Sequence, residues 1–380
     1  MDKLEVFGAR KLKGQIKISG SKNAALPILA STILSNKKVY LTNLPRVKDI
    51  ETMIILLESL GSKVKYLKNK NSISIHNDRK IKTFVAYNLV KTMRAGILVL
   101  GPMLARFGKA KVSTPGGCSI GIRPIDIHLK SLVKLGVKYK MIDGYVHAYS
   151  NKKLKGTKIK FPKISVGATE NLIIASSMAE GKTILSNCAI EPEIKDLVNF
   201  INSIGGNIKW IGKRTLRIFG VNEFRESKYE IMPDRIEAGT YLIAGAITQG
   251  NIKVTGIDPN IIKTEIDILK KIGAKIYLKK KQIKIIGSKI IKNINIKTSP
   301  YPGFPTDLQA QLMVLLCKAK KYSVIVENIF ENRFMHVAEL NRMGAKIKIK
   351  GNKAIISGNT NFQGAEVMAT DLRASVSLII

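Results

Sequence analysis

An internal repeat is the feature of this sequence that most constrains its fold. Five segments end a helical pattern with a glycine and then enter a short run of strand-forming residues, and these glycines recur every 68 to 75 residues, at Gly61, Gly136, Gly205, Gly273 and Gly344. Glycine at the end of a helix suits the left-handed cap conformation that residues with a Cβ resist. Each of the five is therefore expected to end a helix at the same place in a repeated unit.

A second pattern marks the start of a helix rich in small residues in each unit. The alanines of this pattern recur every 64 to 73 residues, at Ala24, Ala95, Ala168, Ala238, Ala310 and Ala374. Between the two patterns, helical periodicity alternates with strand-like runs such as 157–160 and 251–255, so each unit is predicted to hold two helices and several strands. Six units begin, and residue 380 falls early in the sixth. We therefore expect an α/β fold of six repeated units, the sixth incomplete because the sequence stops early.

The charge of the chain is strongly basic. Lys and Arg number 64 against 27 Asp and Glu, which gives a formal net charge of +37. Basic surfaces attract nucleic acids. However, the lysines are spread along the whole chain, few aromatic residues lie among them, and no nucleic-acid-binding motif is present. We interpret the charge as solvated surface and expect no specific nucleic-acid partner; a general polyanion-binding protein remains an alternative.

Membrane spans and metal sites are not expected. No stretch approaches the roughly 20 apolar residues that cross a bilayer, so a cytoplasmic location is predicted. The three cysteines are far apart and the four histidines lack the spacing of metal ligands, which argues against a disulfide framework and a metal site. We predict no metal and no cofactor. The sequence carries no signal for an oligomeric state.

Polar residues gather where the small-residue helices are expected to begin. These residues are Lys22, Asn23, Arg94, Ser165, Asp307, Asp371 and Arg373. A helix N-terminus presents unpaired N–H groups and a partial positive charge, which favour anions. If several such ends converge, then together with Arg123 they form a cleft suited to phosphates or a carboxylate. Each residue taken alone is equally an ordinary helix cap or surface charge.

One cysteine has surroundings that differ from those of the other two. Cys118 lies in a glycine-rich loop, residues 114–124, close to Arg123. A nearby guanidinium lowers the pKa of a thiol, and an open loop leaves the sulfur accessible. Cys188 and Cys317 lie in apolar patterns and are expected in the core. The residues alone therefore predict a repeat-built α/β protein with an anion-binding cleft and one activated cysteine.

Seven blocks in order resemble the UDP-N-acetylglucosamine enolpyruvyl transferases, a family of peptidoglycan precursor synthesis. The blocks are residues 22–27, 91–95, 115–118, 123–126, 304–311, 331–336 and 369–374, so the resemblance covers essentially the whole chain. It implies two domains, each an inside-out α/β barrel of three repeated units, with the substrate cleft between them. Residues 22–230 would form one domain, and residues 1–21 would join 231–380 in the other.

The resemblance also implies the substrates and the residues that bind them. Phosphoenolpyruvate would be bound by Lys22 and Asn23, and Arg94 and Arg123 would lie in the same anionic cleft. UDP-N-acetylglucosamine would contact Arg123, Pro124, Ile125, Asp126, Ile127, Lys163, Ile164, Ser165, Val166, Asp307 and Ile329. No membrane and no further cofactor is implied.

The family pattern assigns catalytic roles to five residues. Cys118 would donate a proton to the methylene carbon of phosphoenolpyruvate, and it is the position that fosfomycin alkylates. Asp307 would act as the base on the 3-hydroxyl of the sugar, while Asp371, Arg373 and Lys22 would assist at the reacting centre. The reaction is an addition followed by elimination of phosphate and needs no metal.

Two alternatives stay close to this reading. A 5-enolpyruvylshikimate-3-phosphate synthase shares the fold and the reaction, but the Cys118 loop argues against it. The other is a catalytically inactive, truncated remnant of the same family. That alternative arises because family members continue beyond residue 377 with a helix, further strands and an arginine that contacts phosphoenolpyruvate.

Overall fold

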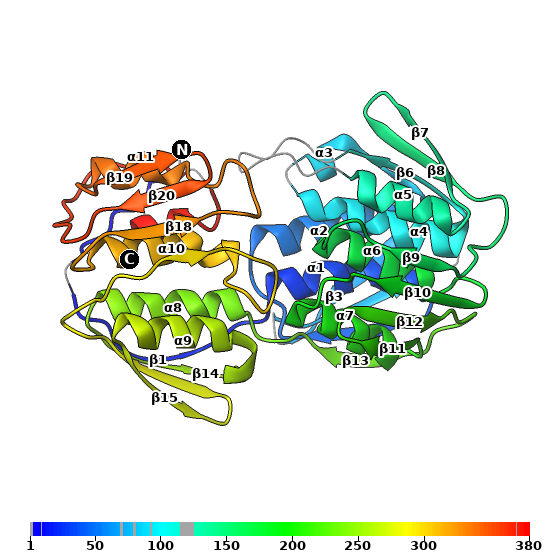
Figure 1. Cartoon of the computed structure of the whole chain (residues 1–380). Helices are drawn as coiled ribbons and strands as arrows, with labels where there is room; N and C mark the ends of the chain where they lie inside the picture. Colours follow the sequence, from blue (N-terminus) through cyan, green and yellow to red (C-terminus); the bar gives the residue numbers. More distant parts are fainter. Residues whose placement is uncertain are drawn as a thin grey trace. The chain divides into compact units, whose positions relative to one another are not determined.

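A computed structural model of the chain describes residues 3–8, 10–68, 71–78, 81–91, 93–114, 125–369 and 371–380. The chain divides into two compact units (Figure 1). The first unit holds the described residues of Ser19–Gly117 and Arg123–Met232, and the second holds those of Met1–Ile18 and Pro233–Ile380.

Three four-stranded sheets of the same topology form the outer layer of the first unit. In hydrogen-bonding order, one sheet consists of β13 (Ser227–Glu230), β2 (Val39–Thr42), β4 (Ile73–Asn77) and β3 (Ser62–Tyr66). Another consists of β5 (Phe84–Val85), β6 (Lys109–Ser113), β8 (Tyr145–Tyr149) and β7 (Lys138–Ile142). The third consists of β9 (Lys158–Lys160), β10 (Lys182–Ser186), β12 (Thr215–Phe219) and β11 (Asn207–Gly212). The first pair of each sheet is parallel and the other two pairs are antiparallel.

The second unit repeats this topology in two described sheets. Their strands, again in hydrogen-bonding order, are β1 (Lys13–Lys17), β14 (Asn251–Thr255), β16 (Gln282–Ile286) and β15 (Lys275–Lys279), and β17 (Ile296–Lys297), β18 (Ser323–Val326), β20 (Lys353–Ile356) and β19 (Ile347–Lys350). The pairing of β1 with β14 joins residues 13–17 to a segment more than two hundred positions later. The N-terminal strand is therefore a structural part of the second unit.

Helices fill the interior of each unit. The first unit has α1 (Lys22–Ser31), α2 (Lys48–Leu60), α3 (Tyr87–Val90), α4 (Leu100–Phe107), α5 (Asp126–Lys134), α6 (Val166–Ser176) and α7 (Pro192–Ser203), with the 3-10 helices η1 (Thr32–Leu34) and η2 (Arg94–Val99). The second has α8 (Arg235–Ile247), α9 (Lys263–Ile272), α10 (Gln309–Cys317) and α11 (His336–Arg342), with η3 (Pro259–Ile262), η4 (Thr306–Leu308) and η5 (Ser375–Leu378).

The central helices are buried on all sides. All nine residues of α10 are buried, as are all residues of α6 from Ala168 to Ser176. A helix enclosed in this way carries small or apolar residues around its whole circumference instead of on one face. The sheets, by contrast, keep one face toward solvent, and every residue of β7 is exposed. Helices inside and sheets outside confirm the predicted inside-out α/β arrangement.

The predicted helix ends are also confirmed. Gly61, Gly136, Gly205, Gly273 and Gly344 all have positive φ, between 96° and 116°, and each lies within two residues of the end of a helix. The sixth unit begins where expected, since the described residues after β20 contain the 3-10 helix η5, although no strand. Among the described residues, no helix is long and apolar enough to cross a membrane.

A carboxyl group in the core of the first unit makes stability depend on pH. Glu170 lies within buried α6, where burial and the charges of Glu193 and Glu191 raise the pKa of its side chain to about 8. A folded-state pKa above the unfolded value means that its stabilising effect is complete below about pH 4.5 and is lost as the pH rises toward 8.

We expect Glu170→Gln, which carries no charge at any pH, to stabilise the protein at high pH. The gain is on the order of a few kcal/mol at pH 8.5 and near zero at pH 4.5. Thermal unfolding of both proteins at the two pH values measures it. As a control, Glu180→Gln makes the same substitution at an exposed glutamate. An equal change of melting temperature at both pH values would contradict the expectation.

Candidate functional site

A cluster of carboxylates and arginines lies at the start of α10 in the second unit. Asp307 belongs to the 3-10 turn η4 that leads into this buried helix. The Nη2 atom of Arg333 lies 2.8 Å from Oδ1 of Asp307, and the Nε atom of Arg373 lies 3.8 Å from Oδ2. The side chain of Arg333 is only 5% exposed, whereas that of Asp307 is 25% exposed. One carboxylate is thus held between two guanidinium groups and keeps access to solvent.

A second carboxylate completes the cluster. Nε of Arg333 lies 3.6 Å from Oδ2 of Asp371, and the backbone N–H of Arg373 donates to Oδ1 of Asp371 at 2.9 Å. Arg373 also lies 3.9 Å from Asp234, which caps α8 by accepting from Ile236 N at 2.8 Å. The structure therefore brings Asp307 together with Asp371 and Arg373, which were predicted to lie at a different helix start.

The two guanidinium groups determine the ionisation of Asp307. Burial by itself would raise its pKa, but the charges of Arg333 and Arg373 outweigh this effect and hold the pKa well below its usual range. Nearby His336 is buried, and burial lowers its pKa to about 4. At neutral pH the cluster therefore presents an ionised carboxylate, a hydrogen-bond acceptor for a hydroxyl group, beside a neutral histidine.

The first unit carries a lysine at the start of α1. Ser21 caps this helix by accepting a hydrogen bond from the N–H of Ala24 at 3.3 Å. Lys22 follows at the first helical position, and its Nζ atom lies 2.7 Å from Oδ2 of Asp49. Asn23 is partly buried beside it, and partly buried Arg94 begins η2, which packs against α1. These cationic groups lie at the N-terminal ends of interior helices, as predicted for an anion site.

Two further helix starts lie side by side in the first unit. Ser165 caps α6 through the N–H of Ala168 at 3.3 Å. Gly167 lies so close to His128 of α5 that a Cβ on the glycine would be 3.2 Å from the imidazole ring. The start of α5, with Ile125, Asp126 and Ile127, is therefore near the start of α6, with Lys163, Ile164, Ser165 and Val166.

The structure describes some of the remaining predicted residues and not others. Cys118, Arg123 and Pro124 lie outside the described residues, so their roles stay predictions. Ile329 is 36% exposed in the second unit, and its N–H donates to Oε1 of Glu327 at 2.8 Å. Cys188 and Cys317 are buried, as expected, and burial raises the pKa of each thiol to about 12.

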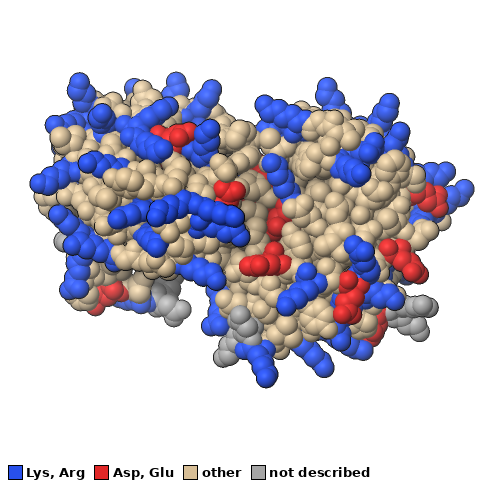
Figure 2. All heavy atoms as spheres, turned by 90° about the horizontal axis from the view of Figure 1, so that it is seen from below, with Lys and Arg blue, Asp and Glu red and all other residues tan. Residues whose placement is uncertain are grey.

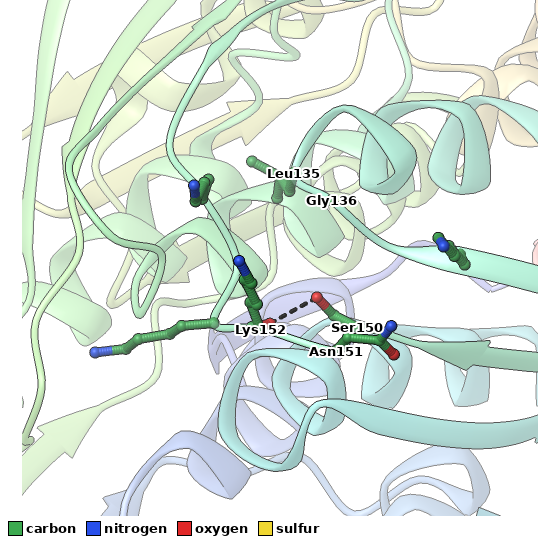
Figure 3. A pocket seen from close by; sticks show the side chains of 8 residues that line it. Leu135, Gly136, Ser150, Asn151 and Lys152 are labelled. Carbon is green, nitrogen blue, oxygen red and sulfur yellow. Dashed lines mark hydrogen bonds between the residues drawn. The ribbon is translucent and has the colours of Figure 1, made fainter.

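A basic surface pocket of about 220 Å³ lies elsewhere in the first unit (Figure 3). It is lined by Leu135, Gly136, Lys138, Ser150, Asn151, Lys152, Lys153 and Lys155, and Ser150 Oγ donates to the carbonyl oxygen of Lys152 at 2.6 Å. Leu135 and Gly136 follow the C-terminal end of α5, whereas Asp126 begins this helix. The pocket therefore contains none of the predicted site residues.

The basic charge is spread over the surface. Figure 2 shows Lys and Arg side chains scattered over the visible face, with Asp and Glu among them. No group of three or more His, Cys, Asp or Glu side chains that could hold a metal ion occurs in the part of the chain that the structure describes.

Several partners of the predicted residues were not predicted from the sequence. Arg333 was noted only as part of a sequence block, and neither Asp49 nor Asp234 was singled out. Asp234 had a detectable signal, since it stands directly before a helical pattern as an N-cap does. Asp49 had none, because its contact with Lys22 depends on how α2 packs against α1.

Comparison with known proteins defines the class. The family model described as "EPSP synthase (3-phosphoshikimate 1-carboxyvinyltransferase)" matches residues 6–380. The enolpyruvyl transferase NikO from Streptomyces tendae has a TM-score of 0.89 at 20% sequence identity, covering 98% of this chain and 89% of that one. EPSP synthase from Acinetobacter baumannii has a TM-score of 0.74 at 18% identity, covering 98% and 89%. At these identities the two structures show the fold alone, and the chain is an enolpyruvyl transferase in fold and family.

Curated relatives make the assignment more specific. UDP-N-acetylglucosamine 1-carboxyvinyltransferase of Pelagibacter ubique is 73% identical over 380 residues, which cover 100% of this chain and 91% of the relative. The same enzyme of Trichlorobacter lovleyi is 49% identical, covering 100% and 90%. The chain belongs to the UDP-N-acetylglucosamine 1-carboxyvinyltransferase family and is a transferase.

Proposed function

We propose that this chain transfers the enolpyruvyl group of phosphoenolpyruvate to the 3-hydroxyl of UDP-N-acetylglucosamine and releases phosphate. This is the first committed step of peptidoglycan precursor synthesis, and a cytoplasmic location is proposed with it. The observation that carries the proposal is the 73% identity over the whole chain. The same identity disfavours an inactive remnant. The ionised Asp307 cluster and the lysine at the start of α1 fit the chemistry.

The proposed chemistry has an addition step and an elimination step. In the addition, the 3-hydroxyl oxygen bonds to C2 of phosphoenolpyruvate, its proton passes to Asp307, and the methylene carbon takes a proton from Cys118. The product is a tetrahedral intermediate with a methyl group at C2. In the elimination, the Cys118 thiolate takes a proton back from the methyl group, the bond from C2 to the phosphate oxygen breaks, and phosphate leaves with the proton that Asp307 held.

The residues that bind substrate follow from their charge and position. Phosphoenolpyruvate carries a phosphate and a carboxylate, for which Lys22, Asn23, Arg94 and Arg123 supply cations and hydrogen bonds. Asp371 and Arg373 would stabilise charge at the reacting centre beside Asp307. The UDP-sugar would contact residues 123–127 and 163–166, together with Asp307 and Ile329. We further propose that residues 22–230 form one enolpyruvyl transferase domain and that residues 1–21 with 231–380 form the other.

A phosphate-release assay distinguishes this function from that of the related synthase. The purified protein is incubated with phosphoenolpyruvate and either UDP-N-acetylglucosamine or shikimate 3-phosphate. Release only with UDP-N-acetylglucosamine is expected. Release with shikimate 3-phosphate instead would assign the other reaction, and release with neither acceptor from a folded sample would contradict transferase activity.

A further inference from the structure

We propose that Arg333 is a positioning residue, which holds the Asp307 carboxylate in place for the acceptor hydroxyl. The proposal deepens the function proposed above and rests on it. Arg333 precedes α11, and all three nitrogens of its guanidinium group face a polar partner. Nη2 is 2.8 Å from Oδ1 of Asp307, Nε is 3.6 Å from Oδ2 of Asp371, and Nη1 donates to Oγ1 of Thr306 at 3.1 Å.

The planar geometry of guanidinium explains why an arginine is needed here. Its nitrogens point in fixed directions, so the hydrogen bond to Thr306 and the 2.8 Å contact with Asp307 fix the orientation of the carboxylate, and Asp371 adds an ion pair at 3.6 Å. Asp307 and Thr306 are neighbours in η4, while Asp371 comes from the segment before η5. Arg333 therefore ties the start of α10 to the last described segment of the chain. A lysine would supply the charge but could not contact Thr306 and Asp307 through two groups of fixed relative direction.

A buried glutamate holds the threonine hydroxyl that contacts Arg333. Thr306 Oγ1 accepts from Arg333 and donates to Oε2 of Glu327 at 2.8 Å, and Glu327 is only 2% exposed. Oε1 of Glu327 accepts from Thr298 Oγ1 at 2.9 Å and from the N–H of Ile329 at 2.8 Å. The guanidinium carbon of Arg333 also lies 5.1 Å from the centre of the Phe330 ring. The arginine is thus held on the side away from Asp307, whose side chain is 25% exposed.

The charge of Arg333 affects the pKa of Asp307, which a purely structural contact would not do. Burial raises the pKa of Asp307 and Arg333 is the first of the charges that lower it, followed by Arg373 and Arg235. The other ionisable groups around the pair are Asp371, His336, Glu327 and Asp234. If the Arg333 charge is removed, less positive charge offsets the effect of burial, and the pKa of Asp307 should rise.

The test compares Arg333→Met, Arg333→Lys and the control Arg342→Met. Arg342 has a 58% exposed side chain and contacts Glu339, so its replacement removes one arginine without touching the cluster. The measurements are kcat and KM between pH 5 and 9, and ¹³C NMR titration of labelled aspartate carboxyl groups, with Asp307→Asn identifying the Asp307 signal. Both use the full chain.

We expect Arg333→Met to lower kcat/KM by about 10²-fold or more at pH 7, because the Asp307 carboxylate is no longer held in one orientation toward the acceptor hydroxyl. The NMR titration of Asp307 should move upward by about one pH unit or more. Arg333→Lys should keep the wild-type pH profile but lower kcat by about tenfold, because the fixed geometry is lost. Arg342→Met should match the wild type.

Three results would overturn the proposal. They are an unchanged kcat in Arg333→Lys, an unchanged kcat/KM in Arg333→Met, and an Asp307 titration that does not move. If Arg333→Met does not fold, the kcat of Arg333→Lys tests the proposal. If the wild-type protein shows no transfer to UDP-N-acetylglucosamine, the proposed function fails instead, and the NMR titration still tests the contact between Arg333 and Asp307.

Discussion

Replacement of Asp307 by asparagine is expected to lower kcat by about 10²- to 10⁴-fold, the range that a positioned acid or base contributes. Asparagine has nearly the same shape and can still accept a hydrogen bond from Arg333 Nη2, which lies 2.8 Å from the carboxylate. It cannot take the proton of the sugar hydroxyl, because a neutral amide is too weak a base. The loss should therefore appear in kcat more than in KM.

The control for Asp307→Asn is Asp258→Asn in the same unit. Asp258 is exposed and caps η3 by accepting from the N–H of Asn260 at 3.0 Å, a contact that asparagine can keep. Steady-state kinetics and the melting temperature of both variants are compared with the wild type. A folded Asp307→Asn protein with wild-type kcat would rule out Asp307 as the base.

Replacement of Cys118 by alanine is expected to reduce phosphate release by a similar factor of about 10²- to 10⁴-fold, since alanine cannot protonate the methylene carbon. The same change should abolish covalent labelling by fosfomycin. This prediction comes from the sequence of the loop and its family resemblance, because Cys118 lies outside the described residues.

The chain supplies two matched controls for Cys118→Ala. Cys188 and Cys317 are fully buried, and burial raises the pKa of both thiols to about 12, so neither forms a reactive thiolate at neutral pH. Cys188→Ala and Cys317→Ala should retain turnover and fosfomycin labelling. Mass spectrometry of the labelled peptides identifies the modified residue. Fosfomycin bound to a peptide other than that of Cys118 would contradict the assignment.

The repeat could be predicted because it depends on local conformation. A glycine with positive φ ends a helix whatever the surrounding tertiary structure, so Gly61 and its four counterparts reveal the period directly. Small residues at the helix starts likewise indicate helices that must pack closely on all sides, as α6 does. Periodicity does not distinguish the first turn of an α-helix from a 3-10 helix, and Arg94 and Asp307 lie in 3-10 segments.

The contacts within the candidate site could not be predicted in this way. Lys22 and Asp49 are 27 residues apart, and Arg333 and Asp307 are 26 apart, so their ion pairs arise from packing between different elements. A charged residue on a helix or in a loop has the same local pattern whether it meets solvent or a partner. Only the three-dimensional structure shows that Arg333, which had no predicted role, touches two of the predicted catalytic carboxylates.

The most direct test of the proposed function is the identity of the product. The purified protein is incubated with phosphoenolpyruvate and UDP-N-acetylglucosamine, and the nucleotide sugar is analysed by mass spectrometry and NMR. We predict an enolpyruvyl ether on the 3-oxygen of the sugar, formed in equal amount to the phosphate released. An unmodified nucleotide sugar from a folded, substrate-saturated sample, or an enolpyruvyl group at another position, would contradict the account.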